Sequence, residues 1–311
     1  MGNLREAYGR ALAALAGEDN RIWALDADLN KSTMSCYMEQ EHPQRYVEAG
    51  IAEANMVGMA AGLALCGKIP FASSFAVFMT GRVYDQIRQS VCIPGLNVKL
   101  CGSSAGLSDY GDGSTHQTVE DIALMRVLPN MTVLCPADAR QAAAMVRAAA
   151  VCEGPVYMRV TRSEIEDLPG DGSFEIGRVD TVKEGSGVTV FAMGAMVGKA
   201  LEAAQTLAAE GISVLVANVS TIKPLDASEV LRLAKQTGLV FTCEEHSVIG
   251  GLGSAVAEAL SESGIPVRMM GIEDVFGQSS NSEAELMEQY GLTSENIARR
   301  IREYVSGRAG K

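Results

Sequence analysis

Two short segments of this sequence carry side chains that suit acid–base chemistry. In the first, Glu53 follows Gly50-Ile51-Ala52 and precedes a run of small and apolar residues with helical character, from Asn55 to Ala64. A carboxylate in such apolar surroundings is poorly solvated, so it readily shares or donates a proton near neutral pH. The alternative is an ordinary acidic residue at a helix N-terminus, where the helix dipole favours negative charge.

The second segment is the polar, glycine-containing stretch Asp112-Gly113-Ser114-Thr115-His116-Gln117. A histidine in such a loop suits general acid–base catalysis, although a single histidine is more often a structural residue. The chain has three histidines, and this motif singles out His116 among them. His42 precedes Pro43 in a polar stretch and is expected at the surface.

Aromatic residues gather between these two segments. Three of the seven phenylalanines, Phe71, Phe75 and Phe78, lie within eight positions. Because Phe75 and Phe78 are three apart, we expect them on one face of a helix that covers Phe75 to Gln89. A flat aromatic face suits stacking on a heteroaromatic ring. The alternative is a core cluster, which we favour for Phe71.

These segments alternate with apolar runs that predict an α/β fold. Strands are expected at 21–27, 98–101, 131–135 and 155–160, with helices between them, which predicts a doubly wound, mostly parallel sheet. A glycine- and acid-containing stretch follows, and then a second alternating unit. We therefore predict two doubly wound domains, at 1–165 and 188–311, joined by a linker at 166–187.

Composition limits the possible partners and the compartment. The 311 residues carry a net charge of −12, which disfavours nucleic acid and anionic membrane surfaces as partners. No apolar run is long enough to span a bilayer, and the N-terminus lacks a signal-peptide pattern. Seven scattered cysteines without CxxC spacing are typical of reduced thiols in a cytoplasmic protein.

Four stretches together resemble the transketolase family, which uses thiamine diphosphate: GIAEANMVGMAAGLA, FASSFAVF, DGSTHQTVEDIALMRVLPNMTVLCPAD and EEHSVIGGLG. The resemblance implies a pyrimidine-binding domain followed by a transketolase carboxy-terminal domain. It also implies that Glu53 hydrogen-bonds the aminopyrimidine ring of the cofactor and so promotes formation of the thiazolium ylid. Phe78 would stack on that ring, and Phe75 would line its pocket. The family often has Tyr where this chain has Gly81.

The resemblance also assigns roles toward a sugar substrate. His116 would contact sugar hydroxyls and assist proton transfer, and Asp112 would bind the hydroxyl beside the carbonyl. A terminal phosphate would be held by Arg159, Ser32 and Arg5, with a surface role as the alternative for the last two. The sequence has Ser104 where many relatives have a phosphate-binding His. Since a serine hydroxyl carries no charge, we expect the anion to be different, differently placed or weakly held.

The similarity is greatest to the carboxy-terminal subunit of a split transketolase. It implies that the diphosphate and Mg²⁺ are held mainly by a separate amino-terminal subunit, in an A2B2 assembly, and no metal ligand is assigned to this chain. The implied reaction transfers a two-carbon ketol unit from a ketose phosphate to an aldose phosphate, as in the pentose phosphate pathway. The carboxy-terminal domain would mainly support dimer packing, with His246 structural.

Three alternatives remain open at this point. A 2-oxoacid dehydrogenase beta subunit shares the glutamate motif but not the DGSTHQ and FAVF stretches. Deoxyxylulose-phosphate synthases also share the glutamate motif, although they are usually one long chain. A non-catalytic subunit that retains the fold is the third alternative, against which the intact Glu53 and His116 argue.

Overall fold

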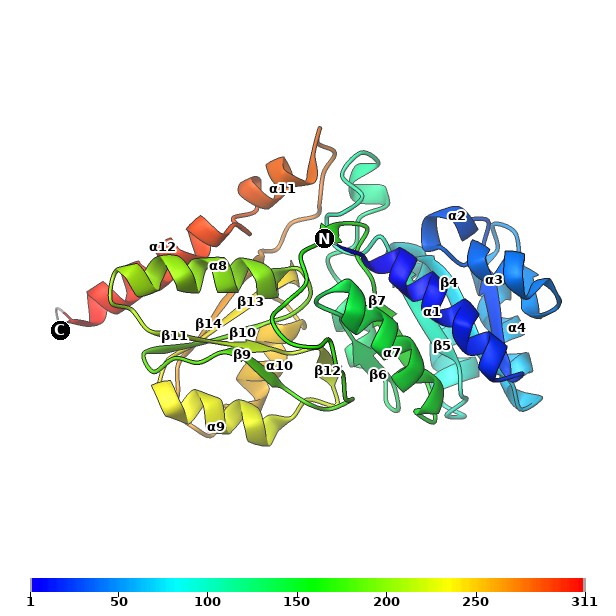
Figure 1. Cartoon of the computed structure of the whole chain (residues 1–311), viewed down its shortest axis with the longest axis horizontal. Helices are drawn as coiled ribbons and strands as arrows, with labels where there is room; N and C mark the ends of the chain where they lie inside the picture. The colour runs from blue at the N-terminus through cyan, green and yellow to red at the C-terminus, as the bar shows by residue number, and fades with distance from the viewer. Residues whose placement is uncertain (1, 310–311) are drawn as a thin grey trace.

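Buried apolar strands form two sheets that lie side by side and are covered by helices. The computed structural model describes residues 2–309, and it confirms the predicted α/β class with mostly parallel sheets (Figure 1). A further antiparallel pair joins β1 (Gly2–Asn3) to β8 (Glu164–Ile165). Within the described residues, no helix combines the length and apolar character that crossing a membrane requires.

The first sheet has seven strands in the order β12-β6-β7-β5-β4-β2-β3, and all neighbouring strands are parallel except β12 and β6. Its strands are β2 (Ile22–Asp26), β3 (Tyr46–Glu48), β4 (Ile69–Phe75), β5 (Lys99–Ser103), β6 (Thr132–Leu134), β7 (Val156–Arg159) and β12 (Thr221–Lys223). Because parallel strands end at one edge, the loops after β2, β4, β5 and β7 are brought together.

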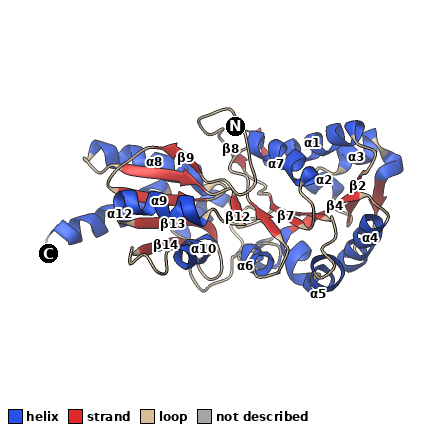
Figure 2. Ribbon diagram, turned by 90° about the horizontal axis from the view of Figure 1, so that it is seen from below, coloured by secondary structure: helices blue, strands red, loops and turns tan. Residues whose placement is uncertain are grey.

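Helices cover both faces of this sheet (Figure 2). One face is covered by α1 (Leu4–Glu18), α3 (Cys36–Glu41) and α7 (Ala139–Val151), and the other by α4 (Glu53–Leu65), α5 (Tyr84–Gln86) and α6 (Asp121–Arg126). The short helix α2 (Asn30–Thr33) follows β2. Side-chain caps begin two of these helices: Asn3 accepts from the Glu6 amide and Asp138 from the Gln141 amide.

The chain between β4 and β5 differs from the prediction of one helix over Phe75 to Gln89. Phe75 is the last residue of β4, and π-helical turns at Phe78–Arg82 and Ile87–Cys92 flank α5. π-helical turns re-aim side chains relative to a regular helix and often occur at functional sites. Short 3-10 turns lie at Pro43–Arg45 and Gly113–Thr115.

The second sheet has five strands in the order β14-β13-β10-β11-β9. They are β9 (Asp180–Lys183), β10 (Val188–Ala192), β11 (Val214–Asn218), β13 (Val240–Ser247) and β14 (Val267–Ile272), and only β9 is antiparallel to its neighbour. β9 lies inside the segment 166–187 that was expected to be a linker, so part of that segment belongs to this sheet.

Helices also cover both faces of the second sheet. In Figure 1, α8 (Met196–Ala209) and α12 (Ser294–Ala309) lie above it, and α9 (Ala227–Thr237) and α10 (Leu252–Ala259) lie below it. α11 (Glu283–Gln289) extends toward the first unit. The two units share one sheet, because β12 follows β11 in the chain but pairs with β6 of the first unit. Lys223 Nζ reinforces this junction by donating to the carbonyls of Arg126 and Leu128.

Candidate active site

Glu53 begins α4, and its carboxylate lies in the protein interior. Gly50, at φ +69°, turns the chain into the helix, and no side chain caps that helix at Ala52. Glu53 is 3% exposed. Its Oε1 accepts a hydrogen bond from Nη1 of Arg82 at 3.0 Å, whereas half of the Arg82 side chain faces solvent. The buried Glu53 carboxylate is therefore paired with an arginine that reaches it from the solvent-exposed side.

Two phenylalanine rings lie beside this ion pair. The centroids of Phe75 and Phe78 are 6.1 Å apart, and the rings are inclined by only 14°. They do not share a helical face as predicted, because Phe75 ends β4 and Phe78 begins a π-helical turn. The Arg82 guanidinium carbon lies 4.3 Å from the centroid of the Phe78 ring. At Gly81, a Cβ atom would meet only open space.

His116 joins the same group of side chains. Its ring lies edge-on to Phe78 at 5.4 Å and to Phe75 at 6.2 Å between centroids. Nδ1 of His116 is 2.9 Å from the Thr115 hydroxyl. The structure thus brings Glu53, Phe75, Phe78 and His116 together from segments that are far apart in the sequence.

Asp112 and His116 belong to a loop, residues 109–117, that the second unit holds in place. Gln117 Nε2 donates to the carbonyls of Asp109 at 3.2 Å and Gln278 at 3.0 Å. The Ser280 amide donates to the Tyr110 carbonyl. Figure 1 shows this loop beside the chain that leads into α11. The second unit therefore positions the loop that carries His116, in addition to any role in dimer packing.

Arg5 and Ser32 meet at the edge where β2 ends. Nη1 of Arg5, in the first turn of α1, donates to the Ser32 carbonyl at 2.8 Å. Partial burial lowers the pKa of Arg5, and the nearby charge of Arg162 lowers it further. Arg162 follows β7, has a half-exposed side chain, and donates from Nη1 to Asp109 Oδ1 at 3.1 Å. We call Arg5, Ser32 and Arg162 the arginine corner.

Arg159 occupies a different environment from the one expected of a substrate ligand. It is 4% exposed; its Nε lies 3.0 and 3.2 Å from the two Asp121 oxygens, and its Nη2 donates to the Glu245 carbonyl at 2.7 Å. Tyr157 also donates to Asp121, at 2.8 Å. These bonds tie β7 to β13 of the second unit. Binding of a substrate anion by Arg159 stays a prediction.

Arg82, Asp109 and Arg162 were not singled out from the sequence. Arg162 lies three residues beyond Arg159 in Thr161-Arg162-Ser163, after the strand rather than within it. Residues just past the carboxyl end of a parallel strand reach the site, whereas residues inside the strand pack into the core. That rule, applied to the predicted strand at 155–160, favours Arg162.

Ser104 and His246 are both buried. Ser104, at φ +51°, is 0% exposed, and its hydroxyl has no partner among the described residues. His246 Nε2 accepts from the Ala123 amide, and burial lowers the pKa of its ring to about 4, so the imidazole is neutral near pH 7. The expected structural role of His246 agrees with this geometry.

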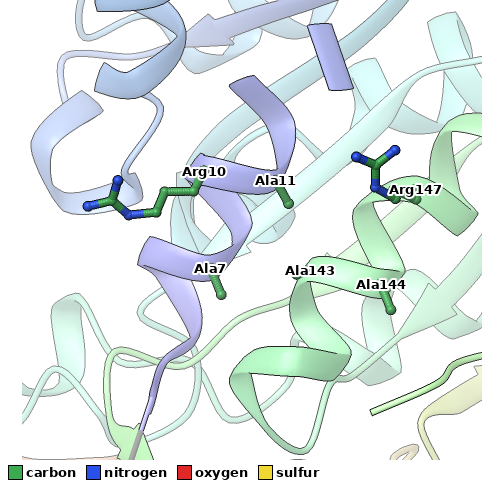
Figure 3. A pocket seen from close by; sticks show the side chains of 6 residues that line it. All are labelled: Ala7, Arg10, Ala11, Ala143, Ala144 and Arg147. Carbon is green, nitrogen blue, oxygen red and sulfur yellow. The ribbon is translucent and has the colours of Figure 1, made fainter. Parts of the chain in front are cut away.

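A shallow hollow between α1 and α7 is lined by none of the candidate site residues (Figure 3). It is lined by Ala7, Ala11, Ala143 and Ala144 together with Arg10 and Arg147. Both arginines are engaged elsewhere, Arg10 with Glu6 and Arg147 with Glu18. We regard it as a seam between two packed helices. Across residues 2–309, no cluster of three side chains suited to a metal ion is found.

The space between Glu53 and Phe78 fits one face of an aminopyrimidine ring. Arg82 shows this directly, because its guanidinium is planar, donates an N–H to Glu53 and lies over the Phe78 ring. A buried carboxylate acceptor beside an aromatic face offers such a ring a hydrogen-bond acceptor and a stacking surface. The fold and this geometry fit the class of enzymes that the sequence resemblance implies, those that bind a cofactor through its aminopyrimidine ring.

Comparison with known proteins gives the family. The profile of the transketolase pyrimidine-binding domain matches residues 2–167, and that of the transketolase C-terminal domain matches residues 177–297. The chain belongs to the transketolase family. Relatives of similar length are described as transketolase subunits, and one solved structure is described as a split gene transketolase.

Two relatives and one solved structure illustrate this similarity. The 6-deoxy-6-sulfo-D-fructose transketolase subunit of Clostridium sp. (strain MSTE9) is 44% identical over 96% of this chain and 94% of its own. One of the subunits of the apulose-4-phosphate transketolase of Phocaeicola vulgatus is 37% identical over 97% of both chains. A solved structure described as a split gene transketolase, inactive beta4 tetramer, is 50% identical over 97% of both chains, with a TM-score of 0.88.

Proposed function

We propose that this chain, assembled with an amino-terminal partner subunit, transfers a two-carbon ketol unit from a ketose to an aldose. The observation that carries the proposal is the joint position of Glu53, Phe78 and His116. A buried carboxylate, an aromatic face and a histidine converge there from three separate segments. Thiamine diphosphate, when bound, supplies the carbon nucleophile and the electron sink for breaking a carbon–carbon bond.

At the cofactor end, the role of Glu53 is to accept a hydrogen bond from the aminopyrimidine ring. Its burial removes competing water, which strengthens that bond. Phe78 stacks on the ring, and Phe75 supports Phe78 from the side. For the ring to bind, Arg82 has to release Glu53, because both groups use the same carboxylate and the same aromatic face.

At the reacting end, His116 moves a proton to or from substrate oxygen. The Thr115 hydroxyl at Nδ1 orients its ring, and the edge-on contact with Phe78 places it beside the cofactor pocket. Asp112, exposed at the start of the Gly113–Thr115 turn, accepts a hydrogen bond from the hydroxyl next to the carbonyl. The contacts of Gln117 with the second unit keep this loop in register.

At the far end, the arginine corner holds an anionic group of the substrate. Arg5 and Arg162 offer guanidinium N–H groups, and Ser32 of α2 lies beside Arg5. Two relatives are named for a ketose with a sulfonate and a ketose with a phosphate, which supports an anionic far end. A contribution of Arg159 to binding this anion stays a prediction.

The remaining cofactor contacts are proposed to come from the partner. We assign Mg²⁺ and the diphosphate to the amino-terminal subunit, in an A2B2 assembly. The relatives named as transketolase subunits support the existence of such a partner. This arrangement makes the activity depend on both chains.

The test is reconstitution with the amino-terminal chain, thiamine diphosphate and Mg²⁺. Ketol transfer should require both chains, and Glu53→Gln should lower turnover roughly a hundredfold or more. Glu202→Gln, on the exposed face of α8, is the matched control and should leave turnover unchanged. Full activity of Glu53→Gln would overturn the proposal, and carbon dioxide release from pyruvate would favour deoxyxylulose-phosphate synthesis instead.

A further inference from the structure

Asp109 lies between the two ends of the proposed substrate site. Asp112 and His116 follow it in the same loop, and Arg162 of the arginine corner is its ion-pair partner. Burial raises the pKa of the Asp109 carboxyl, and the charges of Arg162, Asp112, His116 and Arg5 also act on it. Its side chain is 2% exposed, although Arg162, its ion-pair partner, is half exposed.

The position of Asp109 is fixed from several directions. Its carbonyl accepts from Gln117 Nε2, and its Oδ1 accepts from Arg162 Nη1 at 3.1 Å. The amide of Arg162 also donates to the hydroxyl of Ser108, the residue before Asp109. The carboxylate and the guanidinium are thus held together through both backbone and side chain, which keeps the charge of Asp109 close to the corner.

Asp109 changes the charge that a ligand meets at the arginine corner. The second oxygen, Oδ2, is buried and has no hydrogen-bond partner among the described residues. Arg162 is therefore the main group that compensates the Asp109 carboxylate. In turn, the negative charge of Asp109 offsets the positive charge of Arg162. Two positive charges and one negative charge leave a single positive charge at Arg5, Arg162 and Asp109. Because Asp109 is buried, salt screens it little.

We infer that Asp109 is a specificity-determining residue that makes the corner favour a sugar with a singly charged far end, such as a sulfonate, over one with a phosphate. This inference rests on the proposed function. A phosphate monoester carries about −1.5 to −2 charges near pH 7, whereas a sulfonate carries one. A corner with a single positive charge matches the sulfonate, and the dianion is left with unpaired charge beside a fixed carboxylate.

The experiment compares two donors that differ only at the far end. The assembled enzyme is assayed with D-fructose 6-phosphate and with 6-deoxy-6-sulfo-D-fructose, using one common aldose acceptor. The measured quantity is the ratio of the two kcat/KM values. A third donor, 3-hydroxypyruvate, has no sugar chain beyond the ketol unit, so it reports ketol transfer without the corner.

We expect the wild-type enzyme to prefer the sulfonate. Asp109→Asn, which keeps the shape and removes the charge, should shift the ratio about tenfold toward the phosphate, as expected for one charge a few ångströms away in a partly solvated site. The variant should still turn over 3-hydroxypyruvate, which shows that it folds and assembles, and the ratio of the two sugar donors rather than an absolute rate is the readout. Glu202→Gln removes the same charge from a distant surface and should leave the ratio unchanged.

The outcomes separate this inference from the proposed function. Preference of the wild type for the phosphate, or equal ratios for Asp109→Asn and the wild type, would overturn the role of Asp109 while 3-hydroxypyruvate turnover still supported ketol transfer. Absence of turnover with all three donors would overturn the proposed function and this inference together. If Asp109→Asn fails to assemble, Asp109→Ser is measured against the same three donors.

Discussion

Arg82 makes with Glu53 the contact that the proposed function reserves for the cofactor. Its guanidinium donates to the buried carboxylate at 3.0 Å and lies 4.3 Å from the centroid of the Phe78 ring. One planar cation thus satisfies both the hydrogen-bond acceptor and the aromatic face. The chain alone therefore keeps Glu53 paired, which avoids the cost of a buried, unpartnered carboxylate.

Replacing Arg82 should tighten cofactor binding. Arg82→Met removes the guanidinium that has to release Glu53 before the cofactor binds. The cofactor-free enzyme then loses its ion pair with Glu53, whereas the cofactor-bound enzyme has no such ion pair to lose. We expect the Kd for thiamine diphosphate in the assembled enzyme to fall about two- to tenfold, the range of a partly exposed charged hydrogen bond. Isothermal titration calorimetry measures it, with Arg88→Met on the same segment as control. Weaker binding would mean that Arg82 assists the cofactor.

Replacing Arg162 should affect only substrates with an anionic far end. Arg162→Met removes a charged donor from the arginine corner, and we expect kcat/KM for fructose 6-phosphate to fall roughly ten- to a hundredfold. Turnover of 3-hydroxypyruvate should change little. Because Arg162 is the ion-pair partner of the buried Asp109 carboxylate, the variant should also be less stable, so kinetics are measured at a temperature where circular dichroism shows it folded. An equal loss with both donors would place Arg162 in the chemistry or in assembly instead.

Replacing Arg159 should lower stability without a selective effect on substrates that have an anionic far end. Arg159→Met leaves Asp121 buried without its ion-pair partner, which costs about 3–5 kcal/mol, and we expect the melting temperature to fall by roughly 5–10 °C. Thermal unfolding followed by circular dichroism measures the change. At a temperature where the variant is folded, the ratio of kcat/KM for fructose 6-phosphate and 3-hydroxypyruvate should match the wild type. A selective rise in KM for fructose 6-phosphate would instead support the sequence-based role of Arg159.

Stability should fall as pH rises from 6.5 to 8. Burial raises the pKa of Glu244 from 4.5 to about 8, so in this range the folded chain holds a proton that the unfolded chain has lost. The free energy of unfolding then decreases with pH, by up to about 1.4 kcal/mol per unit for one proton. The lowered pKa of His246 has the opposite effect, but only below 6.5. Urea unfolding of Glu244→Gln should show a smaller pH dependence than that of the wild type.

The sequence predicted much of the fold because local patterns determine it. Alternating apolar strands and helices gave the α/β class, and the two motifs brought Glu53 and His116 to attention. The joint position of these residues with Phe75 and Phe78 follows from parallel strands that end at one edge. Arg82 was missed because its place depends on a π-helical turn, which residue spacing does not reveal.

Contacts between distant segments account for the rest. The loop at 109–117 is held by Gln278 and Ser280, which follow it by more than 160 residues. No periodicity in either segment predicts such a contact. The pairing of β12 with the first sheet and the ion pair between Arg159 and Asp121 also join segments that are distant in the sequence. These features depend on how the two units pack.

The pairing of β12 with β6 has a consequence for protein engineering. A chimera that joins the first unit of this chain to the carboxy-terminal domain of a relative at residue 187 would exchange β12 as well. The edge of β6 would then meet a foreign strand, and a mismatch would leave unpaired backbone groups that promote aggregation. Modules of this family should therefore be recombined by the sheet to which each strand belongs, with residues 221–223 travelling with the amino-terminal module.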